Sequence, residues 1–244
     1  MLEIPIIELD SIDSTNNYAM HLIDADKAQH GLTIMAQSQT GGKGQRGKTW
    51  IDAVGQSLLM SIIVAPQQPI KEQFTFNASI AVAIVKVLQY LYGWEIKIKW
   101  PNDIIINDKK AGGILIENVL RGSKWVYSVI GLGLNVKHEH FPDTLPHATS
   151  LKIASGKDFD IGELCNGIRE NILAEITTQR TAESRMSLYN AYLYKKDVKQ
   201  RFSNNAGKWE ATITRVHIDG SIEVQLENGV IAFYYHGQVL WEWK

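Results

Sequence analysis

The sequence contains a single cysteine, no excess of charge of either sign and no long uninterrupted apolar run. Cys165 is the one cysteine among 244 residues, which excludes an internal disulfide and a cysteine-rich zinc site. Basic residues number 25 and acidic residues 26, so binding of nucleic acid would need a local basic patch. No apolar run approaches the roughly 20 residues that cross a bilayer. We therefore expect neither nucleic acid nor a membrane as a partner.

The N-terminus also lacks the positive charge of a secretory signal peptide. It carries Glu3, Glu8, Asp10 and Asp13 instead. Hydrophobic residues make up 45% and charged residues 21% of the chain, which is typical of a folded globular protein and excludes a largely disordered one. A chain of this length forms one large domain, or a large domain and a small one. Because a signal peptide is not expected, we predict a cytoplasmic protein.

Short apolar segments and stretches with helical periodicity fill the first four fifths of the chain. Strands are expected at 4–9, 32–36, 58–64, 96–100, 104–106, 114–116 and 125–130, and helices after 13–17 and over 69–92, 160–176 and 182–196. The strands that follow Gly93 are separated by short turns and read as an antiparallel meander. This pattern predicts an α+β fold in which helices pack on a mixed, largely antiparallel sheet.

The last residues of the chain have a different pattern. Turn signals occur at Asp219-Gly220 and Asn228-Gly229, and apolar residues alternate with polar ones over 222–226. Helical periodicity is absent. We therefore predict two domains, 1–196 and 197–244, the second a small β-barrel.

A glycine-rich loop follows the second expected strand. Residues Gly42 to Thr49 satisfy the pattern G-x-x-x-x-G-K-[ST] of a P-loop nucleotidase. A P-loop must open a helix, whose N-terminal amides hold the phosphates, and no helix is expected after Thr49. Lys43, Arg46 and Lys48 among several glycines still suit an anionic ligand. A mobile, solvated surface loop would have the same composition.

A second group of polar residues lies farther along the chain. Lys99, Asn102 and Asp103 occur where one expected strand ends and the next begins, and Lys110 precedes two glycines. The segment 131–135 closes a later strand with two glycines and an asparagine. Each of these features is common by itself, since a lysine in a hairpin is usually solvated and a Gly-x-Gly often marks a bulge.

Four segments, taken together and in order, resemble the biotin protein ligases, also called biotin–[acetyl-CoA-carboxylase] ligases. They are DSTNN at 13–17, QTGGKGQRGKTW at 39–50, KWPNDIIINDKKAGGILIE at 99–117 and GLGLNV at 131–136. The resemblance covers nearly the whole chain. It implies a class II synthetase-like catalytic domain over 1–196 and an SH3-like barrel over 197–244.

The resemblance also implies a two-step reaction. The biotin carboxylate would attack the α-phosphate of ATP and give biotinyl-5′-AMP, after which a lysine of a biotin carboxyl carrier protein domain would take the biotin. Biotin would be the substrate, with ATP and Mg²⁺ as cofactors. Since a carboxylate and a triphosphate repel each other, fixed cations, amides and the metal must offset their charge.

The site residues are carried over from the matching segments. Lys110 would stabilise the charge that develops between the carboxylate and the α-phosphate, and Asp103 would organise it; no residue is assigned directly to the metal, which would bind through the ATP phosphates. Contacts to biotin are implied for Ser14, Thr15, Asn16, Gln39, Gly42, Lys43, Gly44, Gln45, Lys110, Gly113 and Gly133. Contacts to ATP are implied for Lys43, Arg46, Lys48, Trp50, Asn102, Ile114 and Asn135.

The sequence departs from the family pattern in two places. Gln45 stands where many members have an arginine, so we expect looser retention of the adenylate. Repressor members carry a helix-turn-helix domain, and the 13 residues before Ser14 are too few for one, so we expect no operator binding. Exposed strand edges could pair two copies of the chain, so a homodimer remains an alternative to a monomer.

Two further functions remain as alternatives. A lipoate or octanoyl transferase shares the catalytic fold, but that family is expected to have a histidine in the segment that corresponds to 37–50, where this chain has none. A non-catalytic binding module could use the C-terminal barrel. Residues 198–244 contain five basic and five acidic side chains, which favours protein docking over nucleic acid.

Overall fold

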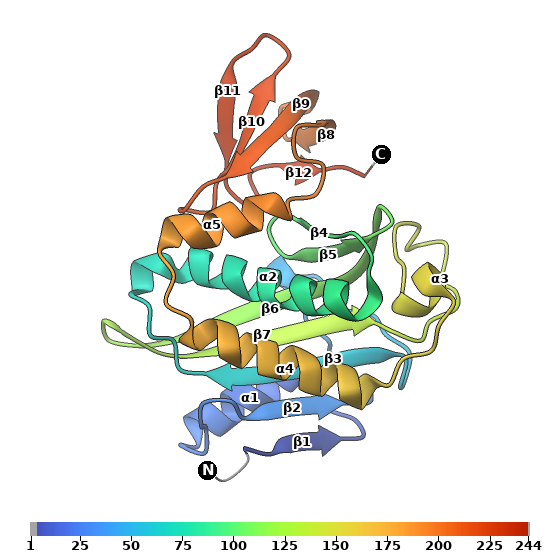
Figure 1. Ribbon diagram of the computed structural model, residues 1–244, viewed down its shortest axis with the longest axis vertical. Coiled ribbons are helices and arrows are strands. Elements are labelled where there is room, and N and C mark those ends of the chain that lie inside the picture. The colour runs from blue at the N-terminus through green and yellow to red at the C-terminus, as the bar shows by residue number, and fades with distance from the viewer. Residues whose placement is uncertain (1–3, 244) are drawn as a thin grey trace.

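The computed structural model describes residues 4–243. It contains two β-sheets, and the smaller sheet lies above the larger one in the view of Figure 1. The first sheet has seven strands in the order β1-β2-β3-β7-β6-β5-β4. β1 and β2 pair in parallel and all other neighbours pair antiparallel. The expected mixed, largely antiparallel sheet is confirmed. Its strands are β1 (Ile6–Leu9), β2 (Thr33–Ala36), β3 (Ser57–Val64), β4 (Ile96–Lys99), β5 (Asp103–Ile106), β6 (Lys109–Arg121) and β7 (Lys124–Asn135).

Helices cover both faces of this sheet. α2 (Gln73–Tyr92) and α4 (Ile161–Thr177) lie across one face in Figure 1, where they share a hydrophobic cluster with Ile62 and Ile130. α1 (Thr15–Asp24) packs on the opposite face against Ile63 and Val129. Neighbouring residues of a strand point to opposite faces, so β3 is buried along its whole length. This explains why its sequence is a continuous apolar run.

The helices agree with the sequence expectations except at their ends. α2 begins at Gln73, after a short 3-10 turn, and ends before Gly93, which has φ 69°. α4 begins as predicted, with the Asp160 side chain accepting a hydrogen bond from the Glu163 amide. α5 (Ala182–Ala191) ends earlier than the predicted residue 196. α3 (Leu151–Ser155) was not predicted, because five residues are too few to show a helical period.

The segment Ile70–Tyr92 is long and apolar enough to cross a membrane, which the sequence expectation overlooked. In the folded protein 67% of its most apolar stretch is buried. Its apolar side chains pack against the first sheet and α4. Its composition is therefore accounted for by its place in the core.

The second sheet contains the C-terminal strands in the order β11-β10-β9-β8-β12, and all its neighbours pair antiparallel. The two predicted turns fall between its strands. The hydrophobic cluster of the first sheet continues into it through Phe202 and Trp241. We propose a domain boundary between residues 196 and 197, shortly before β8. The strands are β8 (Lys199–Asn204), β9 (Gly207–Val216), β10 (Ile222–Leu226), β11 (Ile231–Tyr234) and β12 (Leu240–Trp241).

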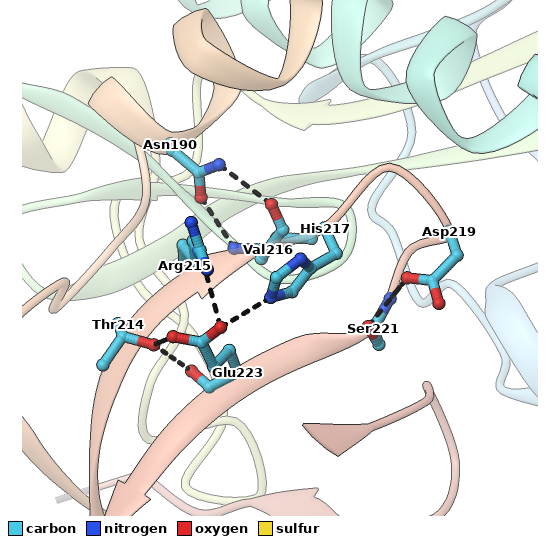
Figure 2. Close-up of polar contacts among 8 residues, drawn as sticks. All are labelled: Asn190, Thr214, Arg215, Val216, His217, Asp219, Ser221 and Glu223. Atoms are coloured by element: carbon cyan, nitrogen blue, oxygen red, sulfur yellow. Dashed lines mark hydrogen bonds and ion pairs between the residues drawn. The ribbon is translucent and has the colours of Figure 1, made fainter. Parts of the chain in front are cut away.

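An asparagine of α5 fastens this second sheet to the rest of the molecule. The Asn190 side chain donates to the Val216 carbonyl at 2.9 Å and accepts from the Val216 amide at 2.7 Å, as Figure 2 shows. Next to this clamp the Glu223 carboxylate accepts hydrogen bonds from Arg215 at 3.1 Å and Thr214 at 2.7 Å. The Asn190 clamp therefore ties the second sheet to α5, while the bonds of Glu223 join β9 and β10 within that sheet.

Candidate active site

A cavity of about 940 Å³ lies where the first sheet meets the second. Its walls come from the start of α1, the glycine-rich loop, the β4–β5 turn, β6, β7 and the turns of the second sheet. The structure brings together here most of the residues that the sequence singled out. Those that line the cavity are Ser14, Thr15, Asn16, Gln39, Lys43, Gly44, Gln45, Arg46, Lys48, Trp50, Asn102, Asp103, Lys110, Gly113, Ile114 and Gly133.

Two of the predicted residues do not line this cavity. Asn135 is buried and donates from its side chain to the Thr149 carbonyl at 2.9 Å. Gly42 lies at the base of the glycine-rich hairpin, and a Cβ atom there would be 2.7 Å from the Trp50 carbonyl oxygen. Both residues support the wall from behind in this structure, and their contacts to ligands stay predictions.

One end of the cavity is polar although it is deeply buried. The Thr15 amide donates to Gln39 Oε1 at 2.8 Å. The Asn16 side chain, 3% exposed, accepts from Ser61 Oγ at 2.6 Å and donates to Glu117 Oε2 at 2.6 Å. Sequence reasoning did not find Ser61 and Glu117, because they lie on β3 and β6 far from the helix they support. They fix the orientation of the Asn16 amide.

Ser14 occupies the N-cap position of α1 without forming a side-chain cap hydrogen bond. A capping serine normally accepts a bond from an amide of the first turn. Ser14 is buried and lines the cavity. Its contact to a ligand stays a prediction.

Two glycines of β7 leave room for the side chains that form this end. A Cβ atom at Gly131 would lie 2.3 Å from Asn16 Oδ1, and one at Gly133 would lie 2.7 Å from the Trp50 ring. No other residue leaves this space free. The two glycines therefore provide the space that Asn16 and Trp50 occupy, and they do not mark a bulge.

A lysine and an aspartate form an ion pair next to the polar end. Lys110 Nζ lies 2.7 Å from Asp103 Oδ1, and their side chains are 36% and 24% exposed. Asp103 pairs across the sheet with Gly113, where a Cβ atom would be 3.5 Å from Lys110 Nζ. Asn102 holds the preceding turn by donating to the Ile114 carbonyl at 2.6 Å. The ammonium group is therefore fixed in position and open to a ligand.

Basic side chains dominate the charge of the cavity. Among the described residues that line it there is one carboxylate, Asp103, and there are five lysine or arginine side chains. The excess of positive charge in a partly enclosed site attracts and holds anions. The basic residues are Lys43, Arg46, Lys48, Lys99 and Lys110.

Lys99 is a part of this set that the sequence did not assign to a ligand. It is 7% exposed, and its Nζ donates to the Trp241 carbonyl at 3.0 Å. The same ammonium lies 5.0 Å from the centre of the Trp241 ring and 4.3 Å from that of Trp243. The contact joins β4 to the end of the second sheet, so Lys99 adds positive charge where the two sheets meet.

Burial is the main reason that the pKa of Lys99 falls to about 8; the Asp103 carboxylate opposes this shift, and Lys110 and Lys48 add to it. The side chain is charged below that pH and loses its charge above it. We expect the affinity of the cavity for a phosphate ligand to fall as the pH rises through about 8. The pKa of Lys99 in the folded state lies below that in the unfolded chain, so deprotonation of Lys99 favours the folded state. Unfolding caused by this titration would therefore not explain the loss of affinity.

The pH dependence can be checked with two lysine variants. Lys99→Met should weaken nucleotide binding several-fold at pH 7 and flatten its dependence on pH between 7 and 9, measured by calorimetric titration with ATP. Lys97, two positions earlier on β4, pairs with Glu95 at the surface, so Lys97→Met is the matched control. An equally steep pH dependence in Lys99→Met would contradict this role.

The glycine-rich loop forms a tight hairpin. The Gly44 amide donates to the Lys48 carbonyl at 2.6 Å, and the Trp50 amide donates to the Gly42 carbonyl at 2.9 Å. β3 follows the loop, and no helix begins between Thr49 and Ser57. The P-loop interpretation is therefore excluded, as the sequence context indicated. The tip of the hairpin reaches the second sheet, where Arg46 donates to the His236 carbonyl at 2.7 Å.

Comparisons with known proteins find relatives in sequence. The bifunctional ligase/repressor BirA of Bacillus spizizenii is 37% identical over 158 residues, 64% of this chain and 48% of that protein. The biotin–[acetyl-CoA-carboxylase] ligase of Paracoccus denitrificans is 30% identical over 126 residues, 51% of each protein. The chain thus spans about half the length of these relatives.

A solved structure and a family model extend the comparison. The structure of the biotin protein ligase from Aquifex aeolicus in complex with biotin and ATP has a TM-score of 0.81 at 21% identity, and the match covers 98% of this chain and 99% of that one. This similarity confirms the fold. A model of the biotin/lipoate A/B protein ligases matches residues 8–135, more than half of the chain. The chain therefore belongs to the biotin/lipoate A/B protein ligase family.

Proposed function

We propose that the protein activates biotin with ATP to form biotinyl-5′-AMP and transfers the biotin to a lysine of a biotin carboxyl carrier protein domain in the cytoplasm. The observation that carries this proposal is the order of groups along one cavity. A buried polar end lies next to the Lys110–Asp103 pair, and basic side chains surround that pair. The neutral head of biotin would bind at the polar end, its carboxylate would lie near Lys110, and the triphosphate of ATP would lie among the basic side chains.

The polar end favours biotin over lipoate. The ureido ring of biotin has two N–H donors and a carbonyl acceptor, which can pair with Ser14, Thr15 and the Gln39 side chain that line the cavity. The dithiolane ring of lipoate offers no such donors, so it would leave buried polar groups unpaired. A site built for hydrogen bonds rejects an analogue that lacks them by large factors.

Lys110 would act on the first step. In that step a carboxylate oxygen of biotin forms a bond to the α-phosphorus, the bond to the β-phosphate oxygen breaks, and pyrophosphate leaves with the electron pair. Negative charge accumulates between the two reacting anions. The Lys110 ammonium, held by Asp103 at 2.7 Å, is placed to stabilise that charge without reorganising.

The residues present fit a magnesium ion that binds mainly through phosphate. No group of three or more His, Cys, Asp or Glu side chains that could hold a metal occurs in the described part of the chain. Magnesium at nucleotide sites is often held by one or two carboxylates and the substrate phosphates. Asp103 and the side-chain oxygen of Asn102 would hold such an ion and its phosphates, and the ion would neutralise phosphate charge.

The carrier domain would approach the cavity from outside, and a second copy of the protein would pair at an edge of the first sheet. The relative from Paracoccus denitrificans is a ligase for acetyl-CoA carboxylase, which supports a carrier domain as the acceptor. β1 forms one edge of the first sheet, whereas the outer side of β4 is bonded to residues 192–194, so a homodimer paired along β1 is part of the proposal.

The proposal predicts the acid that supports pyrophosphate formation. Pyrophosphate release from ATP should require biotin, and lipoate or octanoate in parallel reactions should give at most about one per cent of that rate, a discrimination of about a hundredfold or more. Added carrier domain should then become biotinylated, as mass spectrometry would show. Pyrophosphate release with lipoate or octanoate but not with biotin would select the other branch of the family. The absence of release with every acid tested would refute the activity.

A further inference from the structure

The tip of the glycine-rich hairpin rests in a position prepared by the second sheet. Arg46 Nη1 donates to the His236 carbonyl oxygen at 2.7 Å, although the two residues lie 190 positions apart. His236 belongs to the turn between β11 and β12 and packs edge-on against Trp100, with 5.7 Å between ring centres. This hydrogen bond links the glycine-rich loop to the second sheet, and both Arg46 and His236 line the cavity.

Gly237 provides the space for the arginine. A Cβ atom at Gly237 would lie 1.6 Å from Arg46 Nη1 and 2.0 Å from Cζ. The guanidinium group therefore occupies the volume in which any other residue would begin its side chain. Gly237 has φ +92°, a conformation that glycine adopts without strain. Because the end of an arginine is flexible, a side chain at 237 would displace the guanidinium group, and the positive φ would add strain to the backbone.

Both partners hold fixed backbone conformations. Arg46 has φ 57° and ψ 42°, a left-handed conformation that non-glycine residues seldom adopt unless their surroundings require it. On the other side, the Tyr235 amide donates to Gln238 Oε1 at 2.8 Å and the Gln238 amide donates to the Tyr235 carbonyl at 3.0 Å. The turn therefore presents the His236 carbonyl from a closed, internally bonded loop.

We propose that the turn 235–239 is a receptor for the tip of the glycine-rich loop, and that Arg46 is a positioning residue that holds this loop closed over the cavity. The inference deepens the proposed function and rests on it for the identity of the retained molecule, an acyl-adenylate. The closed loop would keep that intermediate in the cavity between its formation and the attack of the acceptor amine.

Two glycine variants separate this contact from general effects on the second sheet. Gly237→Ala would displace the Arg46 guanidinium group. Gly229→Ala is the matched control, because Gly229 also has positive φ, +83°, in a turn of the same sheet, and a Cβ atom there would have nothing within 4 Å. In the protein without ligand, amide hydrogen exchange over residues 44–50 should become about fivefold faster in Gly237→Ala. It should not change in Gly229→Ala.

A second measurement reports on retention. Gly237→Ala should raise the biotinyl-5′-AMP found free in solution, per pyrophosphate formed, by about fivefold relative to Gly229→Ala. Arg46→Ala should give the same effects, and the double variant should add little, because both changes remove one contact. Additive effects, or unchanged exchange in Gly237→Ala, would overturn the proposal.

The two assays also distinguish this inference from the activity on which it rests. Faster exchange in Gly237→Ala together with no adenylate from the unaltered protein would support the loop contact and refute the proposed ligase reaction. Normal adenylate formation with unchanged exchange and unchanged retention would refute the loop contact and leave the ligase reaction standing.

Discussion

Lys110→Ala should lower the rate of biotin-dependent pyrophosphate exchange by about 10²–10³-fold, the usual cost of removing one fixed group that stabilises developing negative charge. The Lys110 ammonium is 2.7 Å from Asp103 and about one third exposed, so its removal leaves Asp103 within reach of water. The chain should therefore fold normally. The measurement is ATP–pyrophosphate exchange at saturating biotin, with thermal unfolding to confirm the fold.

The neighbouring residue provides the control for this prediction. Lys109 also belongs to β6, is exposed and does not line the cavity. Lys109→Ala removes the same charge from the chain and should exchange pyrophosphate at the rate of the unaltered protein. Near-normal exchange in Lys110→Ala would remove this lysine from the reaction, and equal losses in both variants would point to net charge.

Gly131→Ala should weaken biotin binding at least tenfold, which corresponds to about 1.4 kcal/mol. The added methyl group would lie 2.3 Å from Asn16 Oδ1 and 2.9 Å from its Cγ. Asn16 cannot yield easily, because Ser61 and Glu117 hold both ends of its amide. The displaced amide would leave the polar end of the cavity misshapen. Calorimetric titration with biotin measures the effect.

A glycine outside the cavity gives the matched comparison. Gly167 lies inside α4, and a Cβ atom there would have Val87 at 4.0 Å, an ordinary contact. Gly167→Ala should stabilise the fold by roughly 0.8–1.0 kcal/mol, the helix preference of alanine over glycine, and leave biotin affinity unchanged. A folded Gly131→Ala with normal biotin affinity would contradict the proposed position of the biotin head.

The local elements could be predicted because each has a period or a cap that the sequence displays. The helix over 73–92 repeats its apolar residues at helical steps, and Asp160 with Glu163 marks the start of α4. The lengths of β6 and β7 could not be read in the same way. The expected segments 114–116 and 125–130 stop short of the glycines at 112, 113, 131 and 133, because glycine is rare in strands. The pairing of the two strands extends both through these positions.

The candidate site could be predicted in part. Segments that match the family placed Lys110, Asp103 and the residues near Asn16, and the structure brings them to one cavity. The contributions of the second sheet could not be predicted. The partners in the Lys99 contact are 142 residues apart and those in the Arg46 contact 190, and no local pattern specifies how one sheet docks on another.

The contacts between the two sheets share a chemical feature with an evolutionary consequence. Lys99, Trp100 and Arg46 each donate to a main-chain carbonyl of the second sheet. Every residue type supplies a carbonyl, so these three bonds depend on the backbone path at Gly220, His236 and Trp241 and not on the acceptor side chains. We therefore expect selection on these hydrogen bonds to act on the path of the turns that present the carbonyls.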